Sequence, residues 1–247
     1  GLSYLSKQHG RNLELARKYM SDGNYQGFKF LFDKNRKTFY NLDYVFDEVP
    51  NKLLPFDYDA FAAFPGQVEA AVTNIHTGKA EYVEVPRGRD MRDTLVASCS
   101  VIEASCALPL FFKPVQVGRR YYLDGGVADS VPFERALEQG CDKVIVVLTR
   151  ERGYEKHTDG GTKISSALYR RYPNIVKDLK ERPAKYNESM QKLFRLEKEG
   201  RVFVIAPDTT HGVGRTESDP KRLEELYEEG YLEGKEQMVA LKNYLKK

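Results

Sequence analysis

The residues best suited to chemistry are Asp124, Gly125 and Gly126, which form an Asp-Gly-Gly triplet. The triplet follows the run 121–123, which is typical of a strand, and it precedes a stretch that is typical of a helix. In open α/β sheets, functional sites lie beyond the carboxyl ends of the strands. An acid there could act as a general base, and the two glycines would let backbone approach closely.

The same triplet has a second interpretation, because Asp-Gly is also a preferred turn sequence. In that interpretation Asp124 only connects two elements. The chain would then be a non-catalytic α/β interaction domain. The residues around the triplet leave both interpretations open.

The other reactive residue types do not form a recognisable site. The chain has no G-x-S-x-G, no G-x-x-x-x-G-K-[ST] and no H-E-x-x-H sequence. The histidines stand singly beside Gly or Thr, and the cysteines form no C-x-x-C, so we predict neither a metal site nor a disulfide framework. These residues are His9, His76, His157, His211, Cys99, Cys106 and Cys141.

Composition limits the class of protein. The 247 residues are 41% hydrophobic and 30% charged, which is enough apolar material for a full core and excludes global disorder. The net charge of +3 gives no reason to expect a nucleic-acid partner. The longest aliphatic run, 144–148, is far shorter than the roughly 20 residues of a membrane span. We expect a cytoplasmic location, in solution or at the periphery of a membrane.

The elements around the triplet follow from periodicity and turn residues. Residues 67–75 and 80–85 are predicted strands joined by a turn at 76–79, and a second hairpin is predicted over 115–123. Residues 133–139 form a predicted helix that leads into a strand at 143–149. An unbroken aliphatic strand after a helix indicates a strand covered on both faces, as in a parallel sheet. The fold class is therefore α/β.

The two ends of the chain differ in composition. Residues 3–20 form a predicted helix, and residues 25–64 are crowded with Phe and Tyr. That aromatic region is either core or the wall of an apolar substrate pocket. After residue 160 the charged residues dominate, and we predict helices at 165–179, 184–199 and 216–247 with a short strand at 201–206. The predicted domains are 1–160 and a mostly helical extension, 161–247.

Several short motifs follow one another in a defined arrangement along the chain. They are Val72-Thr73-Asn74 with Thr77-Gly78-Lys79, Ala104-Ser105-Cys106-Ala107-Leu108-Pro109, Phe112-Lys113-Pro114-Val115, Tyr122-Leu123-Asp124-Gly125-Gly126 and Val131-Pro132. Their order and spacing resemble those of bacterial patatin-like phospholipases. In that family a D-G-[GA] motif supplies the catalytic aspartate, which here falls on Asp124. The extension resembles that of one bacterial branch of the family.

The resemblance implies a three-layer patatin-like sandwich with a mostly parallel central sheet and a helical C-terminal extension. It also implies a lipid acyl hydrolase of phospholipase A, lysophospholipase or esterase type that uses a Ser-Asp dyad. Asp124 would be the base, and Gly125 and Gly126 would shape the turn. The substrate would be a lipid or ester, in solution or at a membrane surface, and no cofactor or metal is implied.

The chain departs from the family in one large respect, because the G-x-S-x-G serine and the glycine-rich oxyanion loop are missing. Both would belong to a βαβ unit, so we expect about 40 residues upstream of Gly1. Ser3 and Ser6 lack the flanking glycines of a nucleophile elbow and are not substitutes. The 247 residues alone are therefore expected to be inactive.

Overall fold

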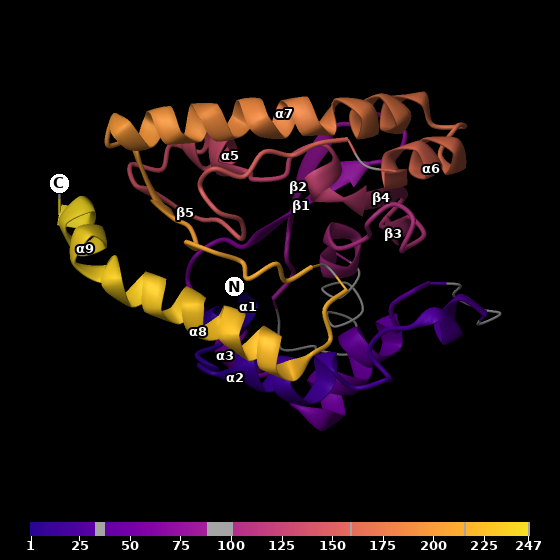
Figure 1. Cartoon of the computed structure of the whole chain (residues 1–247), viewed down its shortest axis with the longest axis horizontal. Helices are drawn as coiled ribbons and strands as arrows, with labels where there is room; N and C mark the ends of the chain where they lie inside the picture. Colours follow the sequence, from indigo (N-terminus) through magenta and orange to yellow (C-terminus); the bar gives the residue numbers. More distant parts are fainter. Residues whose placement is uncertain (33–37, 88–100, 159, 215, 247) are drawn as a thin grey trace. The chain divides into compact units, whose positions relative to one another are not determined.

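The computed structural model (Figure 1) describes residues 1–32, 38–87, 101–158, 160–214 and 216–246. The chain divides into two compact units. The first unit comprises Gly1–Ser130 and Asp159–Arg182. The second unit comprises Val131–Thr158 and Pro183–Lys247. The domain boundary near residue 160 stays a prediction, because compact packing is not the same property as independent folding.

The N-terminal part of the first unit consists of short helices rather than the single helix predicted over 3–20. That prediction is wrong because Gly10 adopts a left-handed φ of 81°, which separates the first two helices. Below, α denotes α-helices and η denotes 3-10 and π-helical segments. They are α1 (Leu2–Leu5), α2 (Arg11–Glu14), η1 (Leu15–Met20), η2 (Phe28–Phe32), η3 (Tyr44–Leu53) and α3 (Tyr58–Ala62).

The sheet of the first unit has the strand order β2-β1-β4-β3, and every pairing in it is antiparallel. Its strands are β1 (Glu69–Asn74), β2 (Ala80–Glu84), β3 (Val115–Val117) and β4 (Arg120–Asp124). Both predicted hairpins are present. The expectation of a mostly parallel central sheet does not hold for these four strands. Tight turns at Gly78 and Gly118, with φ of 70° and 60°, can only join antiparallel neighbours.

The first unit also contains α6 (Gly160–Leu168) and the first part of α7 (Pro173–Lys198). The first part of α7 packs on one face of this sheet. Ile175 and Leu179 of α7 form a buried cluster with Ile75 and Leu123. Because Leu123 is fully buried next to Asp124, this cluster holds the end of β4 in place.

The second unit contains a parallel strand pair. Its elements are α5 (Phe133–Glu138), β5 (Val144–Val147), the rest of α7, β6 (Val202–Ile205), α8 (Pro220–Glu236) and α9 (Met238–Lys246). β5 and β6 pair in parallel from Val144↔Val202 to Val147↔Ile205. The helix-to-strand order predicted from 133–149 is therefore present, and the chain is a mixed α/β protein.

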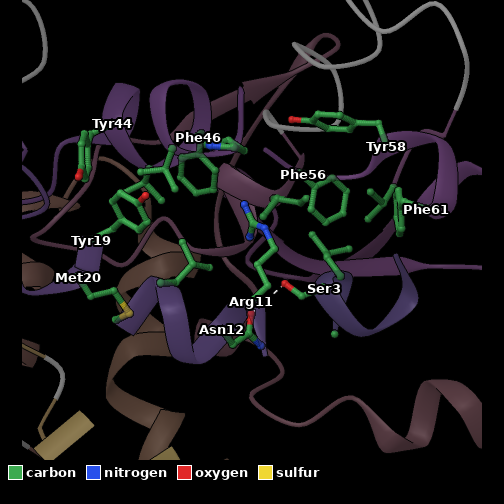
Figure 2. Close-up of a pocket in the computed structure, with 18 of the residues that line it drawn as sticks. Ser3, Arg11, Asn12, Tyr19, Met20, Tyr44, Phe46, Phe56, Tyr58 and Phe61 are labelled. Atoms are coloured by element: carbon green, nitrogen blue, oxygen red, sulfur yellow. Dashed lines mark hydrogen bonds between the residues drawn. The ribbon is translucent and has the colours of Figure 1, made fainter. Parts of the chain in front are cut away.

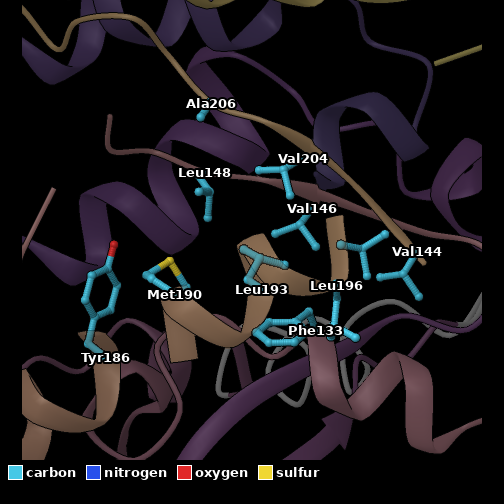
Figure 3. Close-up of a cluster of buried hydrophobic side chains, with 11 residues drawn as sticks. Phe133, Val144, Val146, Leu148, Tyr186, Met190, Leu193, Leu196, Val204 and Ala206 are labelled. Carbon is cyan, nitrogen blue, oxygen red and sulfur yellow. The ribbon is translucent and has the colours of Figure 1, made fainter. Parts of the chain in front are cut away.

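The core of the second unit lies between one face of this strand pair and α7 (Figure 3). Val144 and Val146 point into it, where they meet Leu193 and Leu196. The other face of β5 is not covered by the residues described here, since the Val147 side chain is 68% exposed. The expectation that β5 is covered on both faces is therefore wrong for the described part of the chain.

Candidate functional site

Asp124 lies at the carboxyl end of β4, where the backbone turns sharply into the 3-10 helix η4 (Gly125–Val127). Its amide N–H donates to the carbonyl oxygen of Ala107 at 2.9 Å. Its carboxylate oxygen Oδ1 accepts the amide N–H of Gly126 at 2.6 Å and so caps η4. The half-buried carboxylate therefore has a defined orientation at the strand end.

Thr73 of β1 secures the same turn from the neighbouring strand. Its side chain is fully buried, and its hydroxyl donates to the carbonyl oxygen of Asp124 at 2.8 Å. The same hydroxyl oxygen accepts the amide N–H of Ala128 at 3.2 Å. Thr73 thus bridges the two sides of the turn. Its place in the Val72-Thr73-Asn74 motif was visible in the sequence, but this bridging role was not.

The two glycines are both close to other atoms. A Cβ on Gly125 would overlap the backbone carbonyl of Ala71, so only glycine allows β1 and the turn to approach this closely. A Cβ on Gly126 would lie 2.9 Å from Oδ1 of Asp124 and 3.2 Å from Nη2 of Arg182. The guanidinium of Arg182 therefore borders the turn. Its position in the middle of the chain's longest helix offered no signal for this role in the sequence.

Cys106 is the nucleophilic side chain that interacts electrostatically with Asp124. Loss of solvent around the thiol, followed by the negative charges of Asp124 and Glu103, raises the pKa of Cys106 to about 11. The thiol stays protonated at neutral pH, so Cys106 is a poor nucleophile. Cys106 and Cys141 are free thiols, and Cys99 lies outside the described residues.

A pocket of about 410 Å³ lies among the N-terminal helices of the first unit (Figure 2). Its walls are mainly aromatic and aliphatic side chains, and Asp124 is not one of its lining residues. The aromatic residues that line it are Tyr19, Tyr25, Tyr44, Phe46, Phe56, Tyr58 and Phe61.

The aromatic region 25–64 therefore does not have a single role. Phe46, Phe56 and Phe61 line the pocket, as one of the two interpretations expected. Tyr40 is instead buried and stacks on Phe112, with ring centroids 5.4 Å apart, which is a core contact. Phe28 is 74% exposed and belongs to neither group.

Besides its tyrosines, the pocket has polar lining side chains at Ser3, Arg11, Asn12 and Arg87. Ser3 donates its hydroxyl to Oδ1 of Asn12 at 2.9 Å, and Ser6, which is not a lining residue, donates to the carbonyl oxygen of Ser3. Both hydroxyls thus take part in local structure. Arg11 also lines the pocket, and its guanidinium carbon lies 5.4 Å from the centre of the Phe56 ring.

Two further properties of the described residues bear on the site. No group of three or more His, Cys, Asp or Glu side chains among them is arranged to hold a metal ion. Of the helices that the structure describes, none combines the length and the apolar character needed to cross a bilayer.

The fold and the turn thus define a mixed α/β protein with an anchored acid at a strand end. Comparison with known families assigns the chain more closely: the family described as "Patatin-like phospholipase" matches residues 6–137, more than half of the chain. The chain belongs to this family, and the resemblance seen in its motifs is confirmed. A second family, "Domain of unknown function (DUF6363)", matches residues 172–246.

One curated relative is "Uncharacterized protein YjjU" of Escherichia coli (strain K12). The two chains are 31% identical over 91 residues, which cover 34% of this chain. The match spans about a quarter, 26%, of the length of that relative.

Proposed function

We propose that this protein is a lipid acyl hydrolase in which Asp124 is the base of a Ser-Asp dyad. Family membership supports the general activity, and the anchored carboxylate of Asp124 at the end of β4 is the observation that supports the dyad. The bond from Gly126 fixes the orientation of the carboxylate, and a carboxylate held in this position could accept a proton from a serine hydroxyl.

The serine of the dyad would come from a G-x-S-x-G segment encoded upstream of Gly1. Its hydroxyl oxygen would attack the acyl carbonyl while its proton moves to Asp124. Backbone amides of a glycine-rich loop would stabilise the oxyanion. The alcohol of the ester would leave with the proton. A water molecule, deprotonated by Asp124, would then hydrolyse the acyl-enzyme and release the carboxylic acid.

The position of the turn suits this role. A carboxylate is a weak base in water, so its effect must come from a fixed position beside the serine hydroxyl. Thr73, Gly125 and Gly126 supply that rigidity through the contacts described above. The apolar pocket lined by Phe46, Phe56 and Phe61 would accept the acyl chain.

Replacing Asp124 with Asn tests the dyad. Asp124→Asn keeps the acceptor oxygen that caps η4 and removes the basicity, so kcat should fall at least about a hundredfold. The assay is hydrolysis of p-nitrophenyl butyrate by the protein with its upstream segment. Asp129→Asn is the matched control, because the amide still accepts the Tyr82 hydroxyl that bonds Asp129 at 2.6 Å. Turnover of the control should stay within a few-fold of the unaltered protein.

Two outcomes would contradict the proposal. A folded Asp124→Asn variant with near-normal turnover would remove Asp124 from the mechanism. A variant that unfolds would show that the cap on η4 is the main role of Asp124, which favours the interaction-domain interpretation. Thermal unfolding of each variant, measured beside the assay, separates these outcomes.

A further inference from the structure

Two arginine side chains line this mainly apolar pocket among the residues that the structure describes. Arg87 is already paired, because it donates to the carbonyl oxygen of Phe64 and lies 3.8 Å from the carboxylate of Glu84. The other is Arg11. It extends from α2 into the middle of the lining residues (Figure 2). Its Nη2 donates to the carbonyl oxygen of Leu54 at 2.7 Å, and its guanidinium lies near the face of the Phe56 ring. These two contacts hold the side chain in an extended position across the pocket.

The guanidinium has donor capacity that the described residues do not use. An arginine has five N–H donors, and Nε of Arg11 is buried without a hydrogen-bond partner in the described part of the chain. Buried donors in folded proteins are normally paired, so an unpaired one calls for an explanation. A bound ligand with acceptor oxygens would supply the missing partner.

The charge of Arg11 is also not balanced by an ion pair. Within the described residues, no carboxylate oxygen lies within ion-pair distance of its guanidinium. Loss of solvent is the largest influence on its pKa and lowers it, while Tyr58 and Glu14 act weakly in the opposite direction. A cation that is partly removed from water and lacks an anionic partner favours an anionic ligand.

The surroundings of Arg11 define the rest of the ligand. Much of the rest of the pocket wall is apolar and includes Leu15, Val45, Val49, Phe46, Phe56 and Phe61. These side chains offer dispersion contacts and no hydrogen bonds, which suits an aliphatic chain. A volume of about 410 Å³ lies in the range of small-molecule sites.

We propose that this pocket binds a single aliphatic chain with an anionic head group, and that Arg11 binds the head group. The head group is a carboxylate or a phosphate, since both present the paired oxygens that a guanidinium fork matches. The role of this binding site in catalysis rests on the function proposed above. Arg11 is then a specificity residue that selects singly acylated anionic lipids.

A displacement assay with matched ligands tests the proposal. The fluorescent fatty acid 11-(dansylamino)undecanoate is bound to the protein and displaced by laurate, dodecyl phosphate or 1-dodecanol, which share one chain length. Laurate and dodecyl phosphate should bind at least about tenfold more tightly than dodecanol, which is the range for hydrogen bonds to charged groups. The better competitor of the two anions identifies the head group.

Variants of Arg11 separate the charge from the pocket. Arg11→Gln should reduce affinity for laurate about tenfold or more and leave affinity for dodecanol within about twofold. Arg11→Lys should retain part of the preference for anions, because it keeps the charge and loses the fork. Lys18→Gln is the matched control, because it removes an exposed positive charge from the adjoining helical segment outside the pocket.

The possible failures can be told apart. Equal affinities for laurate and dodecanol, or an unchanged laurate affinity in Arg11→Gln, would overturn the role of Arg11. Failure of the unaltered protein to bind the dansyl probe would overturn the pocket as a lipid site. If binding depends on Arg11 but Asp124→Asn retains full esterase turnover, the binding proposal stands and the dyad fails. If Arg11→Gln loses dodecanol affinity as well, the substitution has collapsed the pocket, and Arg11→Lys is then the test. A preference of Arg11→Lys for laurate over dodecanol supports the role of the charge, and equal affinities overturn it.

Discussion

The two sheets that the structure describes contain similar apolar strands, but their strands are connected in different ways. In the first unit, β1 pairs with β2 and β3 pairs with β4 across turns of a few residues. In the second unit, β5 and β6 are separated by more than fifty residues that include all of α7. Local turns determine the register within each hairpin of the first sheet, although the β1–β4 pairing that joins the hairpins links distant segments. In the second sheet no such local turn joins the strands, so helix packing must determine the register.

This comparison shows where the candidate site depends on local structure. The Asp124 turn follows one local hairpin, and its bond to Gly126 is local, whereas its contact with Thr73 depends on the β1–β4 pairing between the two hairpins. The parallel pair depends on Leu193 and Leu196 of α7, which pack on it from a distant part of the chain. The two sheets should therefore respond differently to loss of their cores.

The largest effect is expected from truncating one fully buried leucine in each unit. Leu123→Ala and Leu193→Ala should each lower the free energy of unfolding by about 2–5 kcal/mol. Amide hydrogen exchange should then show lost protection in β5 and β6 for Leu193→Ala. The β1–β2 hairpin should keep part of its protection in Leu123→Ala, because its turn remains. A uniform loss of protection across both units in either variant would remove the distinction between the sheets.

A smaller effect is expected at the closest backbone contact of the Asp124 turn. Gly125→Ala places a methyl group against the carbonyl of Ala71, and overpacking of this kind costs about 1–3 kcal/mol. Gly153→Ala is the control, since no described atom lies within 4 Å of its added Cβ. Urea unfolding of both variants measures the difference. Equal stability of the two variants would show that β1 can move away from the turn, and the first sheet would then be less tightly determined than proposed.

The smallest effect is expected for a loop contact of the second unit. Glu151 accepts the hydroxyl of Thr210 at 2.6 Å and its amide N–H at 2.7 Å, and these bonds, the hydroxyl bond first, lower the pKa of Glu151. A lowered pKa means that the charged carboxylate favours the folded state. The contribution is therefore present above the ordinary value of 4.5 and is lost as pH falls through the folded pKa.

Thr210→Val removes the hydroxyl and nearly preserves shape. At neutral pH the variant should melt at a slightly lower temperature than the unaltered protein. The loss in free energy of unfolding should be less than about 1 kcal/mol, because the pair is partly exposed. The difference should shrink as the pH is lowered below 4.5. Thermal unfolding at a series of pH values measures it. A difference that is constant with pH would assign the contact to packing rather than to charge.

Sequence patterns predicted the elements well where the signals were local. Both hairpins, α5, β5 and the turn at Asp124 follow from turn residues and apolar runs. Among the strands that the structure describes, the parallel pairing expected from the aliphatic run of β5 is limited to the β5–β6 pair, because periodicity describes a strand and not its partners. The break at Gly10 was missed because the apolar positions on either side of it were consistent with one helix.

The site was predicted only in part, for a related reason. Asp124, Gly125 and Gly126 are consecutive, so their motif is visible in the sequence. Thr73 was visible as part of the Val72-Thr73-Asn74 motif, but its contact with the turn depends on strand pairing. The approach of Arg182 depends on helix packing, which has no sequence signal at a fixed spacing. The aromatic wall of the pocket was visible as composition, whereas Arg11 was one basic residue among many.

The core of the second unit also has a consequence for the evolution of the two sequence families in this chain. Phe133 lies in the segment matched by the patatin-like family, Leu193 lies in the segment matched by DUF6363, and β5 lies in neither. All three contribute to a single buried cluster. A recombination event that separated the two segments would leave each lineage with an incomplete interior. Selection against such breaks would keep both segments in one reading frame, so the two sequence families should evolve as one unit here.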